Sequence, residues 1–100
     1  MKILDKIRIG SVDYDIRQTD KNVVVDCKAC YGAIHYSDHV IELDSKLCDR
    51  QRMELTLLHE VFHGILHERA IRVENEEDLV EGLARGMHQI LRDNPEMFGG

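Results

Sequence analysis

Two histidines and a glutamate within residues 59–63, in the order HEVFH, are the residues of this chain whose types and spacing predict chemistry. On a helix, His59 and His63 lie about 40° apart around the axis and roughly 6 Å apart along it, so both imidazoles can reach one metal ion. Glu60 points aside from that pair, where a carboxylate can contact a water molecule on the open side of the metal. The motif therefore predicts a site for one zinc ion, with Glu60 as a general base.

A third ligand is needed, because a catalytic zinc ion generally keeps three protein ligands and one open position. The candidates are Glu76, Glu77 and Glu81, near the start of a second helical pattern. On a helical wheel Glu77 lies about 60° from Val80, at the border of the apolar arc, which suits a carboxylate that reaches across to the first helix. Glu76 and Glu81 remain alternatives, although a solvated acidic first turn facing the helix dipole explains them better than ligation does.

Other side chains of the right type are predicted to lie outside the ligand set. His67 stands about 12 Å along the axis from His59, so we expect it at the helix end or the cleft wall. His88 stands about 16 Å along the second helix from Glu77, which makes it an outer-wall residue. An extra donor for a developing oxyanion is left unassigned among Tyr31, Tyr36, His35, His39 and His67.

Two helices must position these groups. Leu55, Leu58, Phe62 and Leu66 recur at three- and four-residue spacing, which predicts a helix over about 49–69 with Asp49 near its start. A second helix is predicted over about 75–92, with Asn75 as capping residue and an acidic first turn. Its apolar stripe consists of Leu79, Val80, Leu83, Ala84, Met87, Ile90 and Leu91.

The first part of the chain predicts a sheet over about 1–44. Alternation over 7–20, with Gly10 and Ser11 at the centre, and over 31–43 predicts two hairpins, and the branched residues 23–25 predict a short strand between them. The predicted fold is α+β and zincin-like: a single domain, 1–100, in which a short antiparallel sheet precedes two helices that pack together over it. A strand just before the metal-bearing helix is expected to edge the cleft, where an extended peptide could add as a further strand.

Three cysteines, Cys27, Cys30 and Cys48, fit reduced thiols better than a closed disulfide framework. Cys27 and Cys30, with the histidines His35 and His39, could form a compact second zinc site resembling a zinc knuckle. The hairpin reading of 31–43 opposes it, because alternation stretches these histidines away from the cysteines. We therefore expect incidental thiols.

The net charge and hydropathy of the chain limit the kinds of partner that it is expected to bind. A formal net charge of −6 opposes affinity for a nucleic-acid backbone or an anionic membrane surface. Residues 1–5 are too short and too charged for a signal peptide, and no apolar run approaches the length of a membrane span. We expect a cytoplasmic protein that binds neither nucleic acid nor membrane.

Several segments together resemble the ImmA/IrrE metallopeptidases, in particular the short, prophage-borne members. The resemblance covers roughly the last seventy residues, and its segments are Tyr31-Gly32, residues 40–44, Arg52, residues 56–63, Glu77, Val80, Leu83-Ala84 and the QILRDNP run at 89–95. The gap between His63 and Glu77 is shorter than in the longer members of that family.

The resemblance implies a gluzincin-like site with His59, His63 and Glu77 as zinc ligands and Glu60 as base. It implies a metalloendopeptidase whose protein substrate is a repressor-type regulator of a phage or mobile element. The alternative is a catalytically silent prophage protein that uses the metal for stability and acts as a protein-binding module, because the same residues can hold a structural zinc ion.

Overall fold

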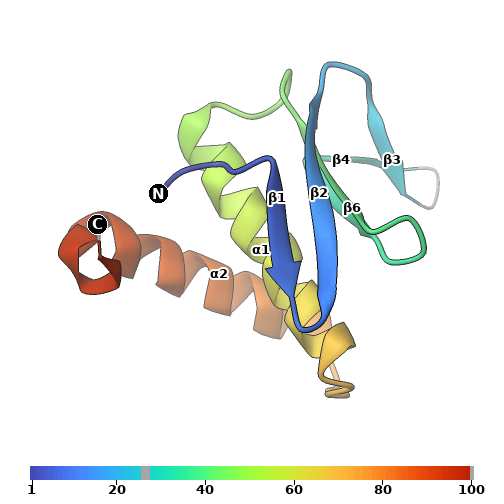
Figure 1. Ribbon diagram of the computed structural model, residues 1–100. Coiled ribbons are helices and arrows are strands. Elements are labelled where there is room, and N and C mark those ends of the chain that lie inside the picture. The colour runs from blue at the N-terminus through green and yellow to red at the C-terminus, as the bar shows by residue number, and fades with distance from the viewer. Residues whose placement is uncertain (26–27, 100) are drawn as a thin grey trace.

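The computed structural model describes residues 1–25 and 28–99. Within them, strands come first and helices follow, which confirms the predicted α+β class and element order (Figure 1). The elements are β1 (Lys6–Ile9), β2 (Val12–Thr19), β3 (Val23–Val25), β4 (Lys28–Cys30), β5 (Gly32–His35), β6 (Val40–Asp44), α1 (Arg50–Glu68), α2 (Glu76–Asp93) and the 3-10 turn η1 (Pro95–Phe98).

The main sheet has the strand order β1-β2-β6-β5 and is mixed. Both predicted hairpins are present, since β1 pairs antiparallel with β2 and β5 pairs antiparallel with β6. The prediction of a wholly antiparallel sheet is wrong, because β2 and β6 pair in parallel, with Ile16 opposite Ile41. A parallel pair needs a long crossover, and the segment that contains β3, β4 and β5 provides it.

The crossover carries a small ribbon of its own. β3 was predicted from its branched residues, whereas β4 was not, because Lys28–Cys30 shows no strand-like alternation. The two strands pair antiparallel, separately from the main sheet. This ribbon leads directly into β5, whose other edge is unpaired within the described sheet.

The core lies between the sheet and α1. Tyr14, Ile41 and Leu43 are fully buried on the strands, and they pack in one cluster with Met53 and Leu57 of α1. The buried face of α1 is therefore rotated from the predicted one. It also contains Thr56, Glu60 and Gly64, whose polar or small side chains an apolar pattern cannot detect.

The second helix packs against α1 and η1, and not across the sheet as predicted (Figure 1). Val80 and Ala84 are fully buried in that contact, as their place in the predicted stripe requires. Leu79 and Leu83 of the same stripe are 40% and 44% exposed, because α2 packs on α1 and does not also cover the sheet. No helix in the described part of the chain has the length and apolar character that crossing a membrane requires.

The two helix starts differ. Asp49 caps α1 as expected: its Oδ1 accepts a hydrogen bond from the Arg52 backbone N–H at 2.8 Å. Asn75 precedes α2 in a left-handed conformation with φ of 54°, and its side chain makes no capping hydrogen bond, so that prediction is wrong. The predicted acidic first turn of α2 is present.

We expect Gly32→Ala to lower the free energy of unfolding by about 1–3 kcal/mol, because α1 approaches β5 closely at this point. The new Cβ would lie 2.6 Å from the Thr56 methyl group and 2.8 Å from the Glu42 carbonyl oxygen, which is rigid backbone. Urea unfolding measures the change. The matched variant Gly82→Ala meets nothing within 4 Å on α2, and should gain up to about 1 kcal/mol from helix propensity. Wild-type stability of Gly32→Ala would contradict the close approach.

Candidate metal centre

Two histidines of α1 face the same point. His59 and His63 are one helical turn apart, and their Nε2 atoms lie 3.2 Å from each other. Their rings meet edge to face, with centroids 4.9 Å apart. Both side chains are largely covered, with 13% and 14% exposed. The rings are therefore held by their surroundings and present their Nε2 atoms to one shared position.

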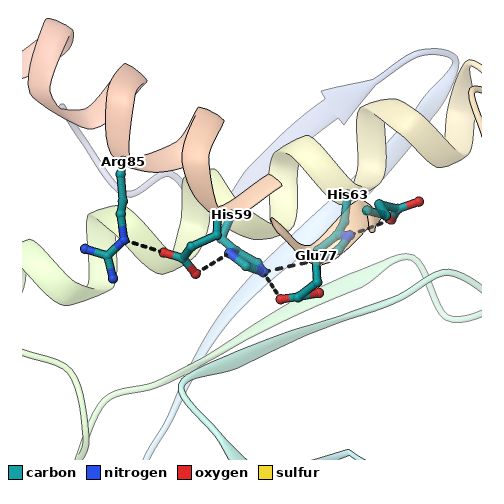
Figure 2. A network of polar contacts seen from close by, with 6 residues as sticks. His59, His63, Glu77 and Arg85 are labelled. Atoms are coloured by element: carbon teal, nitrogen blue, oxygen red, sulfur yellow. Dashed lines mark hydrogen bonds and ion pairs between the residues drawn. The ribbon is translucent and has the colours of Figure 1, made fainter. Parts of the chain in front are cut away.

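The carboxylate of Glu77 reaches that position from the first turn of α2 (Figure 2). Its Oε1 lies 2.6 Å from His59 Nε2, and its Oε2 lies 2.9 Å from His63 Nε2. One donor atom from each of these three residues lies within 4.8 Å of the others, and they are the only such group found among the described residues. The Glu77 side chain is 71% exposed, so the position opens toward solvent.

The two neighbouring acids bind the other side of the rings. Glu76 Oε2 lies 2.6 Å from His63 Nδ1, and Glu81 Oε2 lies 3.2 Å from His59 Nδ1. Arg85 in turn holds Glu81 at 2.8 Å. Glu76, weighed from the sequence as an alternative ligand, therefore lies at hydrogen-bond distance from His63 and can orient its ring, and Glu81, the other alternative, makes an ion-pair contact with the His59 ring. In the sequence, the only sign of these contacts is that the two acids cluster near the start of the second helix. Which acid meets which histidine depends on how the two helices pack.

The donor set fits a bound zinc ion. When each histidine carries its hydrogen on Nδ1, facing Glu76 or Glu81, both Nε2 lone pairs and the Glu77 carboxylate face the shared position, and a cation there would satisfy all three. Zinc–nitrogen bonds of 2.0–2.1 Å at tetrahedral angles separate two nitrogens by about 3.3 Å, and the observed separation is 3.2 Å. Two imidazoles and a carboxylate are also ligands that zinc commonly takes.

Glu60 lies beside this group and is only 8% exposed. Burial raises the pKa of its carboxyl, and the electrostatic influence of the neighbouring His59 and His63 opposes that shift. A raised pKa makes the carboxylate a stronger proton acceptor than an exposed glutamate. Glu60 also lines the same cavities as His59 and Glu77, so its side chain has access to the space in front of the three donors.

A cleft runs past the centre between β5 and the two helices. It consists of two cavities of about 270 Å³ and 290 Å³ that share Gly32, His59, Glu60 and Glu77 as lining residues. Residues 32–34 of β5 line the second cavity, and β5 is an edge strand of the sheet. The expected arrangement, with a strand along the cleft, is therefore present, although β5 and not the last strand before α1 provides it.

Tyr36 lines one end of the cleft, and the ring of His67 packs against it. Their rings stack with centroids 3.8 Å apart, and the Tyr36 hydroxyl donates to the His63 carbonyl oxygen at 3.3 Å. Burial, together with the negative charges of Glu76 and Glu60, raises the pKa of Tyr36 to about 12, so the hydroxyl remains a donor at neutral pH. His67 lies in the last turn of α1, as the helix-end alternative predicts, and contacts the cleft only through the Tyr36 ring.

The remaining histidines have partners away from the centre. His35 pairs with Glu42 at 2.6 Å on the sheet, and the His39 ring contacts Tyr14 edge to face. Neither histidine is grouped with Cys30 in a metal-binding cluster of the described residues, and Cys27 lies outside those residues. His88 was expected at the outer wall. Instead it is only 12% exposed and lies 3.0 Å from Glu54 of α1, because α2 turns this face toward α1.

Comparisons of the chain with protein-family models, with curated proteins and with solved structures find no match. Of the residues selected from the sequence, the structure brings His59, His63 and Glu77 together and places Glu60 beside them.

We expect zinc to raise the melting temperature of the chelator-treated chain, because an ion that binds only the folded state stabilises it by about 2.7 kcal/mol at 100 times its Kd. His63→Ala should lose most of this rise, since it removes one of the three converging donors. His67→Ala is the matched control and should keep it, because its ring stacks on Tyr36 away from the centre. Scanning calorimetry with and without zinc measures the effect, and an undiminished rise in His63→Ala would contradict the site.

Proposed function

We propose that this chain is a zinc-dependent metallopeptidase of the ImmA/IrrE type that hydrolyses a peptide bond in a protein substrate. The observation that carries the proposal is the convergence of His59, His63 and Glu77 on one open position beside the buried carboxylate of Glu60. A zincin-like fold is part of the same proposal: the α+β order, the motif on α1 and the third donor on α2 support it.

Different side chains of the chain have different roles in the proposed hydrolysis. His59, His63 and Glu77 would hold one zinc ion, and when bound this ion supplies a Lewis acid that activates a water molecule and polarises the scissile carbonyl. Glu60 accepts the proton of the attacking water and delivers it to the leaving amine. Glu76 and Glu81 hold the imidazole rings in the orientation that directs both Nε2 atoms to the metal.

The substrate is proposed to bind as an extended peptide along β5. The free edge of this strand offers backbone N–H and C=O groups to a further strand, and the cavities beside it reach the metal centre. The motif resemblance supports a repressor-type regulator of a phage or mobile element as the protein substrate. Direct nucleic-acid binding and membrane binding are no part of the proposal, in keeping with the net charge of −6.

Glu60→Gln should keep zinc and lose peptide hydrolysis by at least about 100-fold, because the ligands remain while the base is lost. The assay is cleavage of a peptide pool from digested denatured proteins, read by mass spectrometry, beside zinc content by elemental analysis. Glu74→Gln, a substitution in the exposed loop before α2, is the control and should retain wild-type cleavage. Unreduced cleavage by Glu60→Gln would overturn its assigned role.

Glu77→Ala should lose zinc at low micromolar free concentrations, because two histidines alone leave the ion without its carboxylate ligand. Elemental analysis of wild type and variant after parallel dialysis measures the loss. One zinc per wild-type chain together with absent hydrolysis would favour the alternative function, a metal-stabilised module that binds a protein partner. Full zinc retention in Glu77→Ala would remove this residue from the ligand set.

A further inference from the structure

The cleft has a cation at the end that lies away from Tyr36. Arg52 precedes His59 by seven residues on α1, which places the two about 20° apart around the helix and roughly 10 Å apart along it. Both residues line the cavity of about 270 Å³, together with Leu55 and Thr56 on the helix turns between them. Arg52 therefore faces the same space as the metal centre, at some distance from it.

The guanidinium of Arg52 is positioned by an aromatic ring and not by an acid. Its central carbon lies 4.8 Å from the centroid of the Tyr31 ring, in a cation–π contact. It forms no ion pair with any residue of the described ranges 1–25 and 28–99. A cation–π contact engages no carboxylate, so the guanidinium N–H groups can still bind a planar, bidentate partner such as a carboxylate.

The acids that line the same cavity are engaged elsewhere. Glu77 contacts both histidines of the centre, and Glu81 is bound by His59 and Arg85. Glu60 is almost fully buried. Arg52 is thus the only lysine or arginine among the described residues that line this cavity, and it favours an anionic substrate group at a distance from the metal centre.

We propose that Arg52, positioned by Tyr31, is a specificity-determining residue that binds an acidic side chain of the peptide substrate. Arg52 and His59 lie roughly 10 Å apart along α1, and an extended peptide advances about 3.3 Å per residue. We therefore expect the acid about three residues from the scissile bond. The proposal rests on the proposed peptidase function and deepens it by naming a substrate class, peptides with Asp or Glu at that distance. Since the net charge of −6 repels acidic peptides in general, this preference depends on the local cation.

The test uses zinc-loaded protein and the pool of peptides from digested denatured proteins, in two readouts. In the first, the bonds that wild type cleaves are identified by mass spectrometry. We expect Asp or Glu to be enriched about tenfold at one position within three residues of the cleaved bond. Arg52→Gln should lose this enrichment while keeping its zinc, and Arg52→Lys should retain part of it, because the charge remains without the planar fork.

The matched control is Arg50→Gln, on the same helix, whose guanidinium bonds Glu54 and the Met1 carbonyl oxygen outside the cleft. It should keep the acidic preference of wild type. Thermal melts of every variant check folding. Where Arg52→Gln fails to fold, the acidic enrichment is compared between Arg52→Lys and wild type, and an undiminished enrichment in Arg52→Lys contradicts the subsite. Cleavage without any acidic preference in wild type, or a preference that survives in Arg52→Gln, would overturn the subsite and leave the peptidase function standing.

The second readout does not depend on hydrolysis. Immobilised, zinc-loaded Glu60→Gln is exposed to the same pool, and the retained peptides are compared with those held by the double variant Glu60→Gln/Arg52→Gln. Retention of acidic peptides that the double variant loses supports the subsite, even where wild type cleaves nothing and the peptidase function fails. Equal retention by both proteins overturns the subsite whatever the activity of wild type.

Discussion

The Nε2 atoms of His59 and His63 lie 3.2 Å apart, and this close approach is the constraint that the rest of the site satisfies. Each ring is oriented by an acid at its Nδ1 atom, Glu76 for His63 and Glu81 for His59. With a hydrogen on each Nδ1 atom, the two Nε2 lone pairs converge with the Glu77 carboxylate, and a cation bound there would stabilise the arrangement. The first turns of α2 supply these acids, so the centre exists only where the two helices pack.

This requirement explains how α2 begins and how it packs. Its acidic first turn faces the histidines of α1, while Asn75 makes no side-chain cap. Val80 and Ala84 are fully buried and dock the helix on α1, and Glu77 and Glu81, on neighbouring turns, reach the two imidazoles from there. The same contact leaves part of the apolar stripe exposed, because α2 contributes to the site from the side and does not cover the sheet.

One helix connects the core, the metal centre and the cleft. The period of 3.6 residues turns Met53, Leu57 and Gly64 of α1 toward the sheet, and the histidines toward α2. Glu60 is buried on the sheet side yet lines the cavities, because β5 passes close to α1 at Gly32. That close approach brings the edge of β5, the buried carboxylate and the three converging donors to one cleft, as the proposed hydrolysis of an extended peptide would require.

The sequence alone determined what depends on near neighbours in the chain. Helical spacing placed His59 and His63 on one side of α1, alternation and turn residues predicted both hairpins, and the helical wheel selected Glu77. Tertiary structure decided what depends on distant partners: the parallel pairing of β2 with β6, the roles of Glu76 and Glu81, and the place of Arg52 in the cleft. Local periodicity fixes which way a side chain points along its own element, but only the packing of elements fixes what it meets.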